Sequence, residues 1–118
     1  MRAGVIGVGD MGSGLAKNLL RNGFQVTGFD IDPARMKALT DMGATTADSA
    51  AMVGQNADAI FVMVMNGAEV SDALFGDDGA VAHMAQGSAV ILSATVKPHQ
   101  ARSVAERMAG SGIYLIDS

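Results

Sequence analysis

The stretch Gly7-Val8-Gly9-Asp10-Met11-Gly12 decides how this chain folds, because it matches the pattern G-x-G-x-x-G. The apolar run 3–8 predicts a strand leading into it, and residues 11–22 carry apolar side chains at helical spacing. A strand, a glycine turn and a helix in this order place a helix N-terminus where it can bind a diphosphate. Gly7 then permits the tight turn, Gly9 lets the diphosphate approach the backbone, and Gly12 lets the helix pack closely on the strand. The stretch therefore predicts a dinucleotide site.

An acidic residue completes this pattern at the end of the next predicted strand. That strand covers residues 25–29, and Asp30 follows it, eighteen residues after Gly12. A carboxylate there accepts hydrogen bonds from the ribose hydroxyls of NAD and repels the 2′-phosphate of NADP. Ile31 comes next and is placed in the same site, and Arg35 lies one helical turn further on. We therefore predict NAD as the cofactor, with NADP less favoured and not excluded.

Asp10 is the residue of the glycine turn whose charge argues against contact with a ligand. A carboxylate beside a diphosphate is repelled by it. We expect Asp10 to face solvent instead, where it complements the positive end of the helix dipole. Met11, by contrast, is the methionine expected to touch the ligand.

The remainder of the chain alternates short apolar runs with helical patterns, which is typical of repeated βαβ units. Residues 59–65 form an uninterrupted apolar run, as expected for a strand covered by helices on both faces. The pattern predicts an α/β fold with a doubly wound, mostly parallel sheet of Rossmann type, strand order 3-2-1-4-5-6, in a single domain, residues 1–118. The further predicted strands are 44–46, 89–92 and 113–116, and the further predicted helices are 33–41, 49–55, 70–74, 81–84 and 98–109. Asp32 followed by Pro33 marks the start of the helix 33–41, as an N-cap acceptor and a proline at the first helical position.

The composition excludes several classes of function. The 118 residues carry a net charge of −4 with no cluster of lysine or arginine, so nucleic acid is not an expected partner. Cysteine is absent, which excludes thiolate metal sites and fits a reducing cytoplasm, and no metal site is predicted. The N-terminus lacks a signal-peptide pattern and no apolar run is long enough to span a bilayer, so no membrane partner is expected. We expect a cytoplasmic protein.

Beyond the bare glycine pattern, the chain resembles the β-hydroxyacid dehydrogenases, a family that includes 3-hydroxyisobutyrate dehydrogenase and tartronate semialdehyde reductase. The resemblance covers the whole chain and implies the N-terminal NAD-binding domain of an oxidoreductase. Such an enzyme transfers hydride between a nicotinamide cofactor and a small β-hydroxy acid of the 3-hydroxyisobutyrate, L-threonate or tartronate-semialdehyde type. The residues that carry the resemblance are Gly7, Gly9, Met11, Gly12, Ala16, Asn18, Leu19 and Gly23, and the stretches 66–70, 74–76 and 79–82 resemble the L-threonate dehydrogenase branch in particular.

The resemblance also implies further site residues. Met65 and Asn66 match a loop beside the adenosine ribose, although the family usually has proline where this chain has Asn66. Ser93 and Thr95 match a Ser-Ser-Thr segment near the nicotinamide and the substrate, whose middle serine is replaced here by Ala94. Ser118 matches the start of a substrate-binding segment. The family's catalytic lysine corresponds to no lysine of this chain, so no catalytic residue is predicted within it.

Two other interpretations stay open at this point. The chain is alternatively a stand-alone module that binds or senses NAD without catalysis, or the first domain of an enzyme resembling 6-phosphogluconate dehydrogenase. On the family resemblance, the expected partner is a small hydroxy acid substrate, and the full-length parent is expected to be a homo-oligomer.

Overall fold

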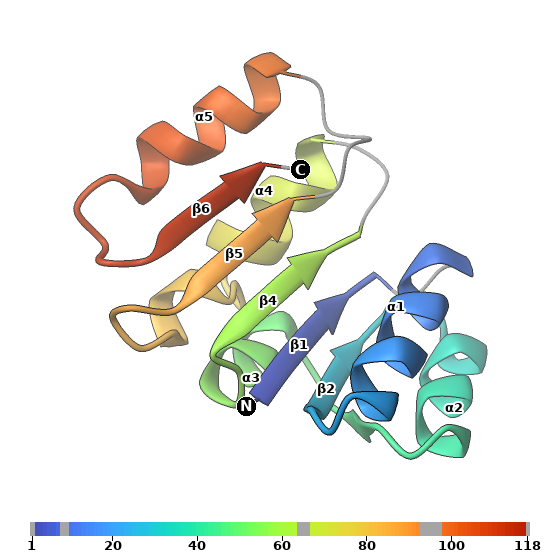
Figure 1. Ribbon diagram of the computed structural model, residues 1–118. Helices are drawn as coiled ribbons and strands as arrows, with labels where there is room; N and C mark the ends of the chain where they lie inside the picture. The colour runs from blue at the N-terminus through green and yellow to red at the C-terminus, as the bar shows by residue number, and fades with distance from the viewer. Residues whose placement is uncertain (1, 8–9, 64–66, 93–97, 118) are drawn as a thin grey trace.

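Six parallel strands form one sheet, with helices packed on both of its faces (Figure 1). The computed structural model describes residues 2–7, 10–63, 67–92 and 98–117. The strand order is β3-β2-β1-β4-β5-β6, which confirms the predicted Rossmann-type arrangement. The strands are β1 (Arg2–Ile6), β2 (Gln25–Phe29), β3 (Thr45–Thr46), β4 (Ala59–Val62), β5 (Ala89–Leu92) and β6 (Tyr114–Asp117).

The helices divide between the two faces according to the direction in which the chain crosses the sheet. The order runs outward from β1 in both directions, and right-handed crossovers then place the two sets of helices on opposite faces. The helices α1 and α2 pack on one face, and α3, α4 and α5 pack on the other. The bounds are α1 (Asp10–Arg21), α2 (Pro33–Asp41), α3 (Ala50–Gln55), α4 (Gly67–Phe75), the short 3-10 helix η1 (Val81–His83) and α5 (Pro98–Met108).

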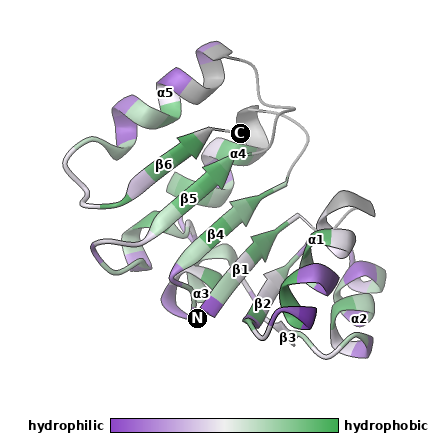
Figure 2. Cartoon of the chain, in the orientation of Figure 1, coloured by the Kyte–Doolittle hydropathy of each residue, from purple (hydrophilic) through white to green (hydrophobic). Residues whose placement is uncertain are grey.

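The larger core lies between the sheet and the helices α3, α4 and α5. Its strand residues include Ile60, Val62, Val90 and Leu92, all with no measurable exposure. Figure 2 shows these strands as apolar along their length, whereas α5 is mostly hydrophilic. This core provides most of the apolar burial and therefore most of the hydrophobic stabilisation.

The smaller core lies under α1 and α2 and is closed by a tight contact between β2 and α2. Val5 of β1, Val26 of β2 and Leu39 of α2 are buried in it. A Cβ added to Gly28 of β2 would lie 2.5 Å from a methyl carbon of Leu39. Glycine at position 28 therefore lets α2 approach the sheet closely enough to bury Leu39 completely.

The first strand ends earlier than the predicted residues 3–8, and the helix that follows begins one residue earlier than the predicted start. Gly7 has φ +87°, a left-handed conformation that leaves the strand, so β1 ends at Ile6. The helix α1 begins at Asp10. The predicted helix 33–41 is confirmed as α2, with Asp32 as its N-cap, accepting a hydrogen bond from the backbone of Ala34, and Pro33 in its first turn.

Two predictions for the middle of the chain were wrong in extent. The predicted strand 59–65 is shorter, because β4 ends at Val62 and Met63 lies outside it. The sequence predicted burial on both faces of this strand. Phe61 is only half-buried, so helices cover one face of the strand less fully than predicted. The predicted helix 70–74 is longer, because α4 covers Gly67–Phe75. Val70 and Leu74, one turn apart, are buried in the larger core, and this packing supports a helix longer than the local pattern indicated.

No helix within the described ranges has both the length and the apolar character that crossing a bilayer requires.

Candidate cofactor-binding site

A hydrogen bond joins the turn after β1 to the end of β2. The backbone N–H of Gly7 donates to the carbonyl oxygen of Phe29 over 3.0 Å. Gly7 makes this turn with its left-handed φ of +87°, which glycine adopts without steric cost. Since Asp30 directly follows Phe29, the bond places the glycine turn next to the predicted ribose-binding acid.

Gly12 brings the first turn of α1 against that same turn. A Cβ at this position would lie 2.4 Å from the carbonyl oxygen of Gly7, a distance that no side chain tolerates. Gly12 is accordingly buried. The packing role predicted for Gly12 is confirmed, and the N-terminus of α1 lies over the carboxyl end of β1 (Figure 1). The first N–H groups of any helix have no partner within the helix, so such a terminus can donate to an anion.

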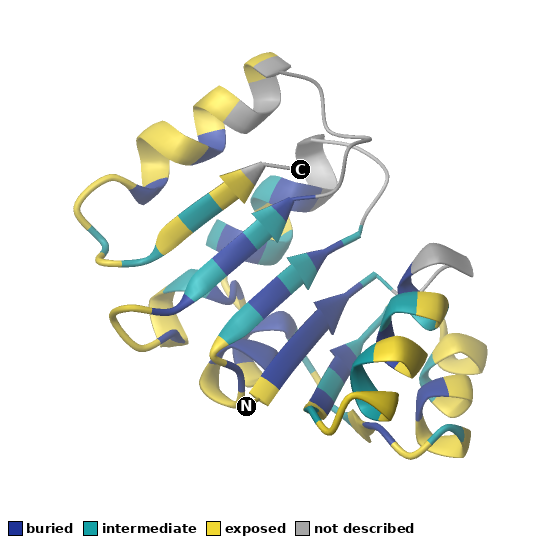
Figure 3. Cartoon of the chain, viewed as in Figure 1, coloured by how far each residue is buried: buried dark blue, intermediate teal, exposed yellow. Residues whose placement is uncertain are grey.

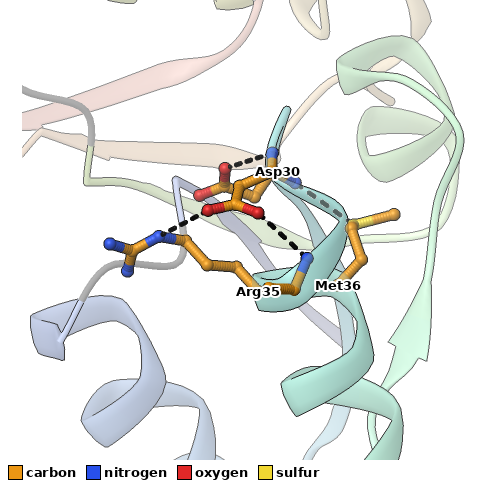
Figure 4. A network of polar contacts seen from close by, with 5 residues as sticks. Asp30, Arg35 and Met36 are labelled. Carbon is orange, nitrogen blue, oxygen red and sulfur yellow. Dashed lines mark hydrogen bonds and ion pairs between the residues drawn. The ribbon is translucent and has the colours of Figure 1, made fainter.

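Asp30 is held in place by one contact of its backbone and one of its side chain. It is half-buried, and its N–H donates to the sulfur of Met36 over 3.3 Å (Figure 4). Its carboxylate oxygen Oδ1 accepts a hydrogen bond from the N–H of Asp32 over 2.9 Å. These bonds orient the carboxylate before any ligand binds, and this preorganisation lowers the entropic cost of binding.

Ile31, the next residue, is 91% exposed. Among the described residues, the other large apolar side chains that are exposed lie on α3 and β6, away from this turn. An apolar surface held open beside a half-buried carboxylate suits a ligand that carries a flat base attached to a sugar.

The structure thus brings Gly7, Gly12, Asp30 and Ile31 together at the carboxyl edge of the sheet. The strands β4 and β5 end at the same edge, because Ile6 is in register with Val62 and Val62 with Leu92. Ligands of open α/β sheets bind at this edge, where the strand order reverses direction.

Other predicted residues cannot be placed in this geometry. The side chains of Asp10 and Met11, in the first turn of α1, lie outside the description, so their predicted orientations stay predictions. The predicted residues that lie entirely outside the described ranges are Val8, Gly9, Met65, Asn66, Ser93, Thr95 and Ser118.

Sequence reasoning missed one interaction close to Asp30. The Oδ2 atom of Asp32 lies 3.7 Å from Nε of Arg35, one turn along α2. The sequence indicated Asp32 as a helix cap and Arg35 as a nearby cation, but it did not indicate that the two would pair. The signal was available, since residues three apart on a helix face one another.

A shallow hollow of about 310 Å³ lies elsewhere, between α5 and the edge strand β6. Met108, Ile113 and Leu115 line it, and it contains none of the predicted site residues. It is mostly apolar and holds no convergent polar groups, so it has no part in the chemistry of the glycine turn.

Comparison with known proteins agrees with a nicotinamide-cofactor-binding domain. The family model described as the NAD binding domain of 6-phosphogluconate dehydrogenase matches residues 2–118. L-Threonate dehydrogenase from Cupriavidus necator is 39% identical over 115 residues, which are 98% of this chain and 39% of that enzyme. 3-Hydroxyisobutyrate dehydrogenase from Pseudomonas aeruginosa is 37% identical over 113 residues, which are 96% of this chain and 38% of that enzyme. The chain therefore spans about two fifths of the length of these relatives.

Solved structures share the fold and carry both nicotinamide cofactors. A 3-hydroxyisobutyrate dehydrogenase from Salmonella typhimurium has a TM-score of 0.89 at 33% identity, covering 98% of this chain and 40% of that one. Imine reductase from Myxococcus stipitatus has been solved with NADP+, and a variant of it with NAD+, both with a TM-score of 0.89. These are 26% and 28% identical to this chain, and this chain covers 40% and 39% of their lengths. With its glycine turn, the acidic Asp30 directly after its second strand and a family match along nearly its whole length, the chain belongs to the NAD-binding domain family of 6-phosphogluconate dehydrogenase, among relatives that are β-hydroxyacid dehydrogenases.

Proposed function

We propose that this chain binds NAD and is the cofactor-binding domain of a dehydrogenase that acts on a small β-hydroxy acid. The observation that carries the proposal is the Gly7–Phe29 hydrogen bond, which holds the glycine turn beside Asp30. A diphosphate bound at the turn would then have its attached ribose within reach of a carboxylate.

The residues of the turn fit a diphosphate. Because Gly12 has no side chain, the first turn of α1 can pack directly against the carbonyl of Gly7. Backbone N–H groups at a helix N-terminus donate to phosphate oxygens, and the helix dipole favours their charge. The proposed diphosphate contacts come from the turn residues Gly7, Val8, Gly9, Asp10, Met11 and Gly12, and Asp10 contributes through its backbone while its carboxylate faces solvent.

Asp30 and Ile31 fit an adenosine. The Asp30 carboxylate, oriented by its bond from Asp32, accepts hydrogen bonds from the two ribose hydroxyls. The exposed side chain of Ile31 provides an apolar surface against which the adenine ring packs. The carboxylate also repels a 2′-phosphate, so NAD is favoured over NADP.

The remaining site residues are proposed on the family resemblance. Met65 and Asn66 would lie beside the ribose, Thr95 near the nicotinamide, and Ser93, Thr95 and Ser118 near the substrate. The bound cofactor accepts or gives the hydride, and this chain binds and orients it. No catalytic residue is assigned here, since the group that moves the hydroxyl proton belongs to the longer parent polypeptide. The parent is proposed to be cytoplasmic and homo-oligomeric.

Cofactor binding can be tested on the chain itself by calorimetric titration with NADH and with NADPH. We expect NADH to bind and NADPH to bind more weakly. The variant Asp30→Asn keeps an acceptor for the Asp32 N–H but loses the charge. We expect it to weaken NADH binding about 10- to 100-fold, because hydrogen bonds to a charged group contribute about 1.5–3 kcal/mol.

A matched control removes the same charge elsewhere. Asp41 is exposed at the far end of α2, so Asp41→Asn should leave the NADH dissociation constant unchanged. Wild-type chain that fails to bind NADH, or equal losses in the two variants, would contradict the proposed site.

The choice of substrate needs the full-length parent. We expect it to oxidise L-threonate or 3-hydroxyisobutyrate with NAD, while the 118-residue chain binds NADH without turnover. A parent active only on 6-phosphogluconate would favour the alternative enzyme class. Turnover by the isolated chain would contradict the division of labour proposed here.

A further inference from the structure

A second carboxylate lies in the loop that carries Asp30. The N–H of Asp32 donates to Oδ1 of Asp30 over 2.9 Å, and the Asp32 side chain in turn accepts a hydrogen bond from the N–H of Ala34 over 2.9 Å. These two bonds fix both acids in one short segment between β2 and α2. The charge of Asp32 therefore lies close to the carboxylate that is proposed to bind the ribose.

The same Asp32 side chain holds a cation. Its Oδ2 atom lies 3.7 Å from Nε of Arg35, and Figure 4 shows the Arg35 side chain extending from α2 toward the loop that carries Asp30. Arg35 lies in the first turn of α2, where the helix dipole disfavours a positive charge. The neighbouring carboxylate offsets that unfavourable placement and keeps the guanidinium paired.

An arginine guanidinium is the side chain best suited to a phosphate, because its planar donors match phosphate oxygens. A 2′-phosphate on the adenosine ribose would enter next to Asp30, one helical turn from Arg35. In this chain it would meet two carboxylates, and a guanidinium already engaged by one of them.

From this arrangement, we propose that Asp32 is a second selectivity residue, which disfavours NADP by keeping Arg35 from the 2′-phosphate. The inference rests on the proposed function, since it deepens the cofactor preference of the same site. Asp30 acts by direct contact with the ribose, whereas Asp32 is a positioning residue that acts through Arg35.

The decisive variant removes the charge of Asp32 and keeps the helix cap. Asparagine is as good an N-cap as aspartate, so Asp32→Asn retains the acceptor for the Ala34 N–H. We expect the NADPH dissociation constant to fall by only about 3- to 10-fold, since a half-exposed ion pair contributes little free energy. The NADH dissociation constant should change less than about 2-fold, because NADH carries no charge at the 2′ position.

A double variant separates release of Arg35 from simple loss of charge. In Asp32→Asn/Arg35→Ala, the gain in NADPH affinity should disappear, because the proposed phosphate ligand is gone. A gain that survives removal of Arg35 would overturn the inference. So would an unchanged ratio of NADPH to NADH affinity in Asp32→Asn.

Two controls keep the result interpretable. Asp41→Asn removes an equal charge at the other end of α2 and should leave the affinity ratio unchanged. If Asp32→Asn melts below the wild type, Asp32→Ser supplies an equally good uncharged cap and must show the same gain in NADPH affinity. Wild-type chain that binds neither cofactor contradicts the proposed function, whereas NADH binding with no response to the Asp32 variants contradicts only the role of Asp32.

Discussion

The sheet face that carries α1 and α2 has two unequal halves. Over β1 and β2 it is closed, and Val5 and Val26 are 0% and 3% exposed. Over β6 it is open, and Tyr114 and Ile116 are 68% and 49% exposed (Figure 3). Between them, Phe61 of β4 and Ile91 of β5 are half-buried, and the register pairs Ile91 with both Phe61 and Ile116. On this face, the exposure of the apolar side chains therefore rises from β1 through β4 and β5 to β6.

The opposite face shows no such gradient across its central strands. Ile60, Val62, Val90 and Leu92 are all fully buried there by α3, α4 and α5. The strands have similar composition on both faces, so burial depends on where the chain places its helices and not on the strands themselves. The glycine turn and Asp30 both extend from the closed half, where packing fixes their positions.

The largest expected difference between the two halves is in the free energy of unfolding that is lost when an aliphatic side chain is truncated to alanine. Leu39 is fully buried in the closed half, so Leu39→Ala should reduce the free energy of unfolding by about 2–5 kcal/mol. Ile116 is half-exposed in the open half, so Ile116→Ala should cost about 1 kcal/mol or less. Urea denaturation of the two variants measures both values. Equal costs would mean that the open half is covered in solution.

The second-largest effect is expected where α1 packs against the turn that follows β1, in the closed half. In Gly12→Ala, the new Cβ would meet the Gly7 carbonyl oxygen at 2.4 Å, so α1 must move away from β1. We expect a loss of about 1–3 kcal/mol in the free energy of unfolding, as for overpacked cores, together with weaker NADH binding. The expectation fails if this variant unfolds at the wild-type urea concentration and binds NADH normally.

A smaller effect of opposite sign is expected two residues later on the same helix. Gly14 is exposed, and a Cβ there would meet no heavy atom within 4 Å. Gly14→Ala should therefore raise the free energy of unfolding by about 0.5–1 kcal/mol, because alanine loses less backbone entropy in a helix. Thermal unfolding of Gly14→Ala, measured alongside Gly12→Ala, tests this prediction. Destabilisation by Gly14→Ala would mean that position 14 is packed against another group in solution.

The smallest effect lies where β1 meets β4, at the amino edge between the two halves. Arg2 donates to both carboxylate oxygens of Asp58, over 3.0 Å from its backbone and 3.1 Å from its side chain. The side-chain hydrogen bond from Arg2 is the main cause that lowers the pKa of Asp58 below its ordinary value of 3.8. A lowered folded-state pKa stabilises the fold above the ordinary value, and this contribution is lost as pH falls through the folded value.

We therefore expect Asp58→Asn to remove a small part of the acid sensitivity of the fold below about pH 4. Both side chains are half-exposed, so the difference from wild type should shrink further in high salt. Urea midpoints measured from about pH 2 to pH 7 test this. Parallel curves for the two proteins would show that the pair adds nothing to acid sensitivity.

Much of the fold could be predicted from local chemistry. The alternation of apolar runs with helical spacing indicated parallel strands joined by helices, and the observed strand order agrees with the prediction. Asp32-Pro33 marked the start of α2, because a side-chain acceptor and a missing N–H both suit a helix N-terminus. The glycines of the turn and Asp30 were identifiable because their spacing follows from the shape of a dinucleotide.

Other features depended on segments distant in the sequence. The full length of α4 and the end of β4 follow from packing against the larger core, which the local pattern of residues 59–75 does not contain. The pairing of Asp32 with Arg35 needed the side-chain geometry, since sequence spacing allows the contact without requiring it.

Sequence by itself determined which residues are apolar, where the backbone needs glycine, and where a carboxylate follows the second strand. Only the tertiary structure decided that Gly7 bonds to the end of β2, and that the apolar face is closed over β1 and open over β6. The physical reason is that helix and turn propensities act within a few residues. Burial and the approach of one strand end to another are set by contacts between segments far apart in the chain.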